Sequence, residues 1–176
     1  MLILASQSPR RKELLEKFHI PFTVRVADID EAMDTAKTPE AEVARVSREK
    51  ALAVTRTPED VVIAADTIVV LAGRVLGKPR SPEDAKQMLR DLSGRDHQVM
   101  TGVTVLWGEK LLSHTEVTDI HFRDLTEGEI ARYVASGEPM DKAGSYGIQG
   151  GAALFCTRMV GDYYNVMGLP VLWIGP

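Results

Sequence analysis

The residues best suited to chemistry lie where an apolar run gives way to a polar one. The short run Leu2–Ala5 is followed directly by Ser6–Lys12, which holds two serines, two arginines and a lysine. A helix that begins here would present unpaired N–H groups and partial positive charge, and the added hydroxyl and guanidinium donors suit phosphate oxygens. Because cations are otherwise unfavourable at a helix N-terminus, we expect a phosphate site; the alternative is a solvated basic first turn.

Two acidic residues are candidates for a metal site. Asp66 follows the buried run Val61–Ala65, and open α/β sheets place their ligand sites at such strand ends. Glu31 closes the acidic run Asp28–Glu31. Carboxylate oxygens are ligands that Mg²⁺ and Mn²⁺ prefer, so Glu31 and Asp66 together could hold either ion. Taken singly, Asp66 could cap a turn and Glu31 could belong to a solvated loop.

Three lysines could balance phosphate charge. Lys78 stands in the turn Gly77–Pro79, where proline restricts the backbone, and Lys50 and Lys142 are further candidates. Taken alone, each of them is better explained as a surface lysine.

A glycine-rich segment, Asp141–Gly151, contains Gln149. Glycines let the backbone approach a ligand closely, although the segment could equally be a mobile connector. The amide of Gln149 both donates and accepts hydrogen bonds, which suits the edge of a pyrimidine base.

Helix-start signals and apolar runs predict the elements that position these residues. Proline follows a capping hydroxyl at Ser8, Thr38 and Ser81, and Thr126–Glu129 matches a capping box, so four helices are expected. The second should run to about Val54 with Val43, Val46 and Ala53 facing inward, and the third should stop near Gly94. Strands are expected at Leu2–Ala5, Phe22–Val26 and Val61–Ala65, with an extended continuation at Ile68–Leu71, and at Val99–Trp107 and Lys110–Phe122, the last two as a hairpin around Gly108-Glu109.

Composition bounds the class of protein. The chain has 176 residues and no linker-like stretch, so we expect one domain over residues 1–176, of mixed α/β class. The net charge of −4 argues against a non-specific nucleic-acid binder, and Cys156, the single cysteine, excludes a disulfide within the chain. No run approaches the roughly 18 apolar residues of a membrane span, and Met1–Ala5 is too short for a signal-peptide core, so the expected compartment is the cytosol.

Several common sites are absent from the sequence. A P-loop fails around Lys78, because Ala72 and Pro79 occupy positions that require glycine and serine or threonine. There is no HExxH zinc helix and no GxSxG elbow. The four histidines have no metal-ligand spacing, so we interpret them as structural.

Taken together, five segments resemble, in order, the Maf family of septum-formation-inhibitor-like nucleotide pyrophosphatases. They are Ser6–Arg11, Asp28–Glu31, Ala65–Thr67, Gly77–Pro79 and Asp141–Gly150, within a likeness that runs from Leu2 to about Pro170. The resemblance implies an elongated mixed sheet with flanking helices, the inosine-triphosphate-pyrophosphatase-like (Maf/Ham1) fold, with a cleft between two lobes.

The resemblance also implies an activity. It implies hydrolysis of a nucleoside triphosphate between the α and β phosphates, giving monophosphate and pyrophosphate, with Mg²⁺ or Mn²⁺ as cofactor. The implied partner is the nucleotide substrate, with no nucleic-acid polymer and no membrane, and the implied assembly is a homodimer. The family is associated with nucleotide-pool cleansing and with arrest of cell division.

Site residues follow from the same likeness. The family's proton acceptor falls on Asp66, and its specificity positions fall on Arg10, Thr67 and Gln149, a trio similar to that of the dTTP and UTP subfamily. CTP and modified pyrimidine nucleotides are possible further substrates. Glu31 and Asp66 would hold the metal, and the charge of the polyphosphate would be neutralised by a set of polar and basic residues: Ser8, Arg11, Lys50, Lys142 and the catalytic Lys78.

Two alternatives stay open at this point. The chain could be a nucleotide-binding regulator of septum formation that acts through a partner, or a pyrophosphatase for 7-methyl-GTP or another modified nucleotide. Two departures from the family are visible: Asp96 replaces a small hydroxyl residue, and only Val171–Pro176 remains where the family usually has a further helix.

Overall fold

The computed structural model describes residues 1–174, which divide into two compact units. The first unit combines Met1–Thr67, Met100–Glu116 and the chain from Tyr164 onward, and the second combines Ile68–Val99 with Val117–Tyr163. The expectation of one domain over residues 1–176 stays a prediction. The chain has only Val171–Pro176 where the family usually has a further helix. Two residues of this segment, Gly175 and Pro176, lie outside the described residues.

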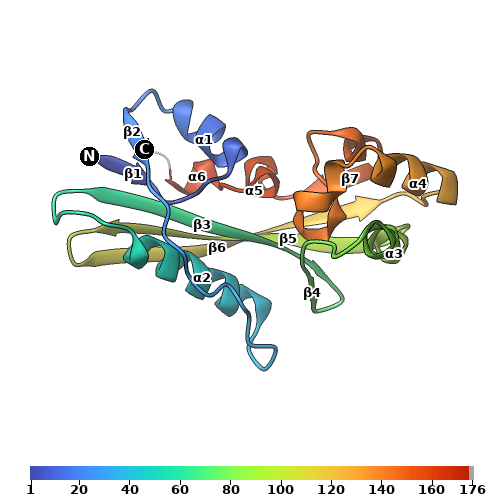
Figure 1. Cartoon of the computed structure of the whole chain (residues 1–176), viewed down its shortest axis with the longest axis horizontal. Coiled ribbons are helices and arrows are strands. Elements are labelled where there is room, and N and C mark those ends of the chain that lie inside the picture. The colour runs from blue at the N-terminus through green and yellow to red at the C-terminus, as the bar shows by residue number, and fades with distance from the viewer. Residues whose placement is uncertain (175–176) are drawn as a thin grey trace. The chain divides into compact units, whose positions relative to one another are not determined.

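Within residues 1–174, seven strands form one mixed sheet in the order β2-β1-β3-β5-β6-β7, with β4 paired to β3 (Figure 1). β1 is parallel to β2 and to β3, whereas β4 and β7 are antiparallel to β3 and β6. The predicted mixed α/β class is therefore confirmed. The strands are β1 (Leu2–Leu4), β2 (Phe22–Val24), β3 (Val61–Leu71), β4 (Arg74–Leu76), β5 (Asp96–Trp107), β6 (Lys110–Phe122) and β7 (Cys156–Val160).

All four predicted helix starts are confirmed. The hydroxyls of Ser8, Thr38 and Ser81 each accept a backbone N–H three residues on, and Thr126 and Glu129 complete the capping box. Each cap satisfies one of the donors that a helix N-terminus leaves unpaired. The helices are α1 (Pro9–Glu16), α2 (Pro39–Ala53), α3 (Pro82–Leu92), α4 (Glu127–Ala135), α5 (Tyr163–Met167) and α6 (Val171–Ile174), with 3₁₀ turns η1 (Glu138–Asp141), η2 (Ala143–Ser145) and η3 (Gly151–Leu154).

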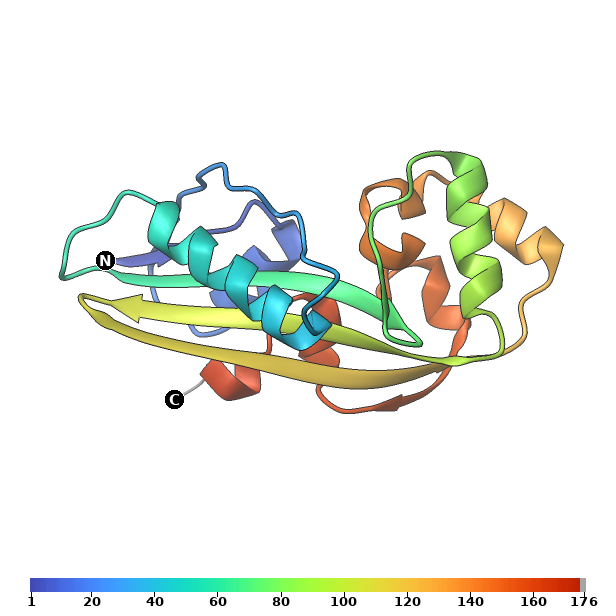
Figure 2. The same ribbon diagram turned by 90° about the horizontal axis from the view of Figure 1, so that it is seen from below.

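In the first unit, α1 and α2 cover opposite faces of the sheet (Figures 1 and 2). The prediction for α2 was wrong at one position, because Ala53 is exposed and Ala51 is fully buried. The row Val43, Ser47 and Ala51 continues at steps of four residues along the buried face, which turns Ala53 to the outside. One cluster of this core comprises Ile3, Ala5, Ala51, Val54, Val62, Ala64 and Leu106.

In the second unit, the buried His97 contacts the glycine-rich segment Asp141–Gly151. His97 on β5 is 2% exposed, and its Nε2 lies 2.6 Å from the hydroxyl of Tyr146. The same imidazole meets the ring of Phe122 edge to face. The neighbouring α3 and α4 pack together in this unit (Figure 2). The aromatic contacts therefore fix the backbone around residue 146, close in sequence to Lys142 and Gln149.

None of the helices within residues 1–174 has both the length and the apolar composition that crossing a bilayer requires.

The buried imidazole predicts acid sensitivity. Burial lowers the pKa of His97 from 6.5 to about 4, so the unfolded chain binds a proton between these pH values and the folded chain does not. Stability is then complete above pH 6.5 and falls as the pH drops toward 4, by about 3 kcal/mol for this group. Urea unfolding of wild type and His97→Gln at pH 7 and pH 4 measures the difference.

His97→Gln should lose less stability on acidification than wild type, because glutamine keeps a hydrogen-bonding group and does not titrate. His19→Gln, which alters an exposed histidine, is the control and should behave as wild type. Equal acid losses in all three proteins would contradict the assignment.

Candidate functional site

The two units share the ten predicted site residues unequally. Seven fall in the first unit, namely Ser8, Arg10, Arg11, Glu31, Lys50, Asp66 and Thr67, and three fall in the second, namely Lys78, Lys142 and Gln149.

Lys50 brings the two predicted carboxylates together. Its Nζ, on the last turns of α2, lies 2.7 Å from Oε1 of Glu31 and 3.2 Å from Oδ1 of Asp66 on β3. It also donates to the backbone carbonyl of Ala65 at 3.3 Å. Lys50 therefore forms ion pairs with both carboxylates and donates hydrogen bonds to Asp66 and to the Ala65 carbonyl. The lysine side chain is only 17% exposed, which limits the screening of its two ion pairs by water.

The donor set of this cluster suits a divalent cation. Glu31 and Asp66 both place an oxygen within reach of one nitrogen, and their two negative charges exceed the single charge of Lys50. Mg²⁺ is usually held by one or two carboxylates and takes its remaining ligands from water and substrate phosphates. Among residues 1–174 no group of three or more acidic, histidine or cysteine ligands forms a closed metal site. Glu31 and Asp66 could therefore supply part of the ligand set of such an ion, and metal binding here stays a prediction.

The loop that carries Glu31 is tied down by α2. The backbone N–H of Asp34 donates to Glu42 Oε1 at 2.6 Å, and Arg45 donates to the carbonyl of Ala32 at 2.8 Å. Glu42 is 3% exposed, and the Asp34 N–H followed by Arg45 holds the pKa of its carboxyl below the ordinary value. The sequence did not predict this role of Glu42 and Arg45. Their spacing of three residues indicates an ion pair within a helix, but it does not show that both side chains also bind the preceding loop.

Arg11 is buried, and three of its hydrogen bonds go to other groups of the protein. Its guanidinium donates to the carbonyl of Gly168 at 2.7 Å, to Ser6 Oγ at 3.1 Å and to Thr67 Oγ1 at 2.9 Å. Burial lowers the pKa of Arg11, and the nearby Asp66 carboxylate opposes that shift. These bonds use three of the five guanidinium N–H donors, so phosphate binding by Arg11 stays a prediction that rests on the other two.

The other two residues of this first turn differ in environment. The hydroxyl of Ser8 accepts the Arg11 N–H at 3.3 Å and so caps α1. Arg10 is half-buried, and its charge contributes to lowering the pKa of Arg11. The helix start therefore gathers positive charge, as the phosphate prediction requires.

In the second unit, a backbone bond joins the segments that carry two of the lysines. The N–H of Gly144 donates to the carbonyl of Gly77 at 3.1 Å, which links the glycine-rich segment to the turn before Lys78. Gly144 has φ +70°, and a Cβ there would lie 2.7 Å from the Val69 side chain, so only glycine fits. Lys142 Nζ donates to the Glu138 carbonyl at 2.9 Å.

Gln149 lies in an exposed turn of the same segment. The turn is closed by the Gly150 N–H, which donates to the Gly147 carbonyl at 3.1 Å. The exposed amide of Gln149 is therefore accessible to a ligand.

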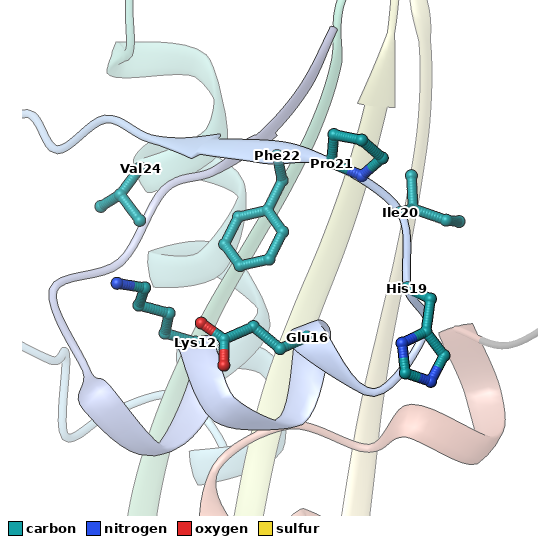
Figure 3. A pocket seen from close by; sticks show the side chains of 7 residues that line it. All are labelled: Lys12, Glu16, His19, Ile20, Pro21, Phe22 and Val24. Carbon is teal, nitrogen blue, oxygen red and sulfur yellow. The ribbon is translucent and has the colours of Figure 1, made fainter.

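A pocket of about 550 Å³ lies elsewhere on the first unit, between α1 and β2 (Figure 3). The ring of Phe22 points toward the side chains of Lys12 and Glu16. None of the ten predicted site residues lines this pocket, whose lining consists of Lys12, Glu16, His19, Ile20, Pro21, Phe22 and Val24.

Asp96, the departure noted in the sequence, forms a surface cluster of charges. Its carboxylate lies 2.7 Å from Nδ1 of His121 and 3.4 Å from the guanidinium of Arg158. The His121 ring nitrogen is the main cause that lowers the pKa of Asp96.

Comparison with known proteins places these observations in a family. A family model described as "Maf-like protein" matches residues 1–174. A dTTP/UTP pyrophosphatase of Geobacillus sp. (strain WCH70) is 52% identical over 97% of this chain and 92% of its own length. A dTTP/UTP pyrophosphatase of Halalkalibacterium halodurans is 49% identical over 97% of this chain and 90% of its own length. Among solved structures, the Ham1 protein of Staphylococcus aureus aligns over 70% of this chain and 72% of that chain, with TM-score 0.48 and 17% identity.

The loop tether can be tested by amide exchange. Glu42→Ala removes the acceptor of the Asp34 N–H, so exchange of that amide should accelerate about tenfold, the size expected for one hydrogen bond. Hydrogen–deuterium exchange of the peptide spanning residues 31–37 measures it.

Glu49→Ala is the matched control, because it removes an exposed partner of Arg45 and leaves the Asp34 bond intact. Equal protection of residues 31–37 in Glu42→Ala and Glu49→Ala would show that Glu42 does not hold the loop.

Proposed function

Because this chain belongs to the Maf family, we propose that it is a nucleoside triphosphate pyrophosphatase that hydrolyses dTTP and UTP to the monophosphate and pyrophosphate. The observation that carries the proposal is the convergence of Glu31 and Asp66 on Lys50, in a chain about half identical to proteins named dTTP/UTP pyrophosphatase. Two carboxylates in one cluster can hold a divalent ion, and such an ion assists attack on a phosphate.

Glu31 and Asp66 would hold the cofactor, Mg²⁺ or Mn²⁺. When bound, such an ion neutralises phosphate charge and lowers the pKa of water in contact with it. The tether of the Glu31 loop to α2 supports this role, because a carboxylate on a fixed loop needs little ordering when the ion arrives.

Asp66 acts as the proton acceptor in this proposal. A water attacks the α-phosphorus and gives its proton to the Asp66 carboxylate, while the bond to the bridging oxygen breaks and pyrophosphate leaves. Lys50 donates to Oδ1 and orients the carboxylate, so Oδ2 is the oxygen that takes the proton. Arg11, Lys50, Lys142 and the catalytic Lys78 neutralise charge on the substrate and leaving group, and the Ser8 hydroxyl offers a hydrogen bond to a phosphate oxygen.

Arg10, Thr67 and Gln149 read the base. Their side chains supply a cation, a hydroxyl and an amide, which together can meet the carbonyl and N–H groups of uracil or thymine. CTP and modified pyrimidine nucleotides are further candidate substrates of the same site.

We propose the cytosol as the compartment, since nucleoside triphosphates are made and used there, and the homodimer implied by the family resemblance as the assembly. The biological roles that fit are nucleotide-pool cleansing and arrest of cell division.

Product analysis tests the proposed function directly. Purified protein is incubated with dTTP, UTP, CTP, ATP, GTP and 7-methyl-GTP, with Mg²⁺, with Mn²⁺ and with chelator. The expected products are monophosphate and pyrophosphate from dTTP and UTP, and none in chelator. Binding without turnover would favour the regulator, and preferred turnover of 7-methyl-GTP would favour the other subfamily.

Asp66→Asn should keep the fold and lose at least about 10²-fold in kcat, the usual scale for a positioned acid–base group. The asparagine oxygen can still accept the Lys50 hydrogen bond but cannot take a proton at neutral pH. Steady-state kinetics with a thermal melt as folding control measure both. Wild-type turnover by a folded Asp66→Asn enzyme would exclude Asp66 as the proton acceptor.

Gln149→Glu tests the reading of the base. Glutamate loses the amide donor and gains a charge, so the preference for uridine and thymidine nucleotides should weaken. Competition between UTP and GTP gives the ratio of kcat/KM values for wild type and variant. An unchanged ratio would remove Gln149 from the base-reading set.

A further inference from the structure

The hydroxyl of Thr67 belongs to a chain of hydrogen bonds inside the first unit. Its Oγ1 accepts from Arg11 at 2.9 Å and lies 2.9 Å from the hydroxyl oxygen of Thr101. Thr101 in turn donates to the backbone carbonyl of Asn165 at 3.0 Å. All four residues belong to the same compact unit.

Counting hydrogen atoms fixes the direction of this chain. A carbonyl can only accept, so the single hydroxyl hydrogen of Thr101 goes to Asn165. The hydrogen between the two threonines must then come from Thr67. With its hydrogen given to Thr101 and one lone pair used by Arg11, Thr67 has only its second lone pair left for a ligand.

The residues on both sides of Thr67 in this series of hydrogen bonds are held in place by the fold. Thr101 on β5 is fully buried, and β5 is the neighbour of β3, which carries Thr67. At the other end, Arg11 is fixed by its bonds to Gly168 and Ser6. Thr67 itself is half-buried, so a ligand can reach it although its hydroxyl cannot turn freely.

We propose that Thr101 is a positioning residue that makes Thr67 an obligate hydrogen-bond acceptor, which favours bases with hydrogen on N3. Uracil and thymine carry N3–H, whereas N3 of cytosine is itself an acceptor. The relatives are named for dTTP and UTP, which differ at the sugar and at C5 of the base but share the N3–H edge. This inference rests on the proposed function, because Thr67 meets the base only if the chain binds pyrimidine nucleotides.

Thr101→Val is the decisive variant. Valine has nearly the shape of threonine but offers Thr67 no acceptor, so the Thr67 hydroxyl regains the freedom to donate. The ratio of kcat/KM for UTP to that for CTP should fall about tenfold, the size of one hydrogen bond. Thr101→Ser keeps the hydroxyl and should keep the wild-type ratio. A loss of packing alone would lower both substrates equally, so an unchanged ratio in folded Thr101→Val would overturn the proposal.

A wild-type measurement keeps the proposal testable if the valine variant does not fold. In N3-methyl-UTP a methyl group replaces the N3 hydrogen, and in 3′-deoxy-UTP the sugar hydroxyl donor is missing. The expected result is a loss of at least about tenfold in kcat/KM with N3-methyl-UTP and little change with 3′-deoxy-UTP. A loss confined to 3′-deoxy-UTP would assign the donor to the sugar and overturn the base assignment.

Calorimetric binding of UMP and CMP separates this inference from the proposed function. Absence of pyrophosphate release by wild type would refute the pyrophosphatase activity, while the UMP to CMP affinity ratio still reports on Thr67. A ratio that falls in Thr101→Val and persists in Thr101→Ser supports the inference, and a ratio equal in all three proteins refutes it.

Discussion

The ammonium group of Lys50 joins three parts of the first unit that are separate in sequence. Lys50 belongs to α2, and its Nζ forms an ion pair with Glu31 in the loop before that helix and hydrogen bonds with Asp66 and the Ala65 carbonyl on β3. Without this cation, two carboxylates would face one another in a partly buried place, where repulsion between like charges is costly. The position of the acidic pair, and any metal chemistry that depends on it, therefore follows from one lysine.

Local features of this chain could be predicted from the sequence. Capping residues, proline at the first helical position and the hairpin around Gly108-Glu109 act through neighbours a few residues away, and the structure confirms each of them. The error at Ala53 arose because helical periodicity gives the width of a buried face but only its packing partners fix where that face is centred.

The tertiary part of the site could not be predicted in the same way. Arg11 is bonded to a carbonyl 157 positions further along the chain, and nothing in the sequence near Arg11 indicates that partner. Thr101 and Glu42 carry ordinary residue types for a strand and a helix, and their roles arise from neighbours that the fold supplies. The sequence predicted that Glu31, Lys50 and Asp66 belong to one site. Only the structure shows that Lys50 forms ion pairs with both carboxylates.

The double attachment of the acidic loop has a consequence for how the chain can vary in length. Glu31 is held at Lys50 and Asp34 at Glu42, so the residues between them must span a fixed distance. An inserted residue at Ala32 or Met33 would break one attachment or the other. The stretch from Thr35 to Lys37 lies beyond the second attachment and is exposed, so length variation among homologues should concentrate there.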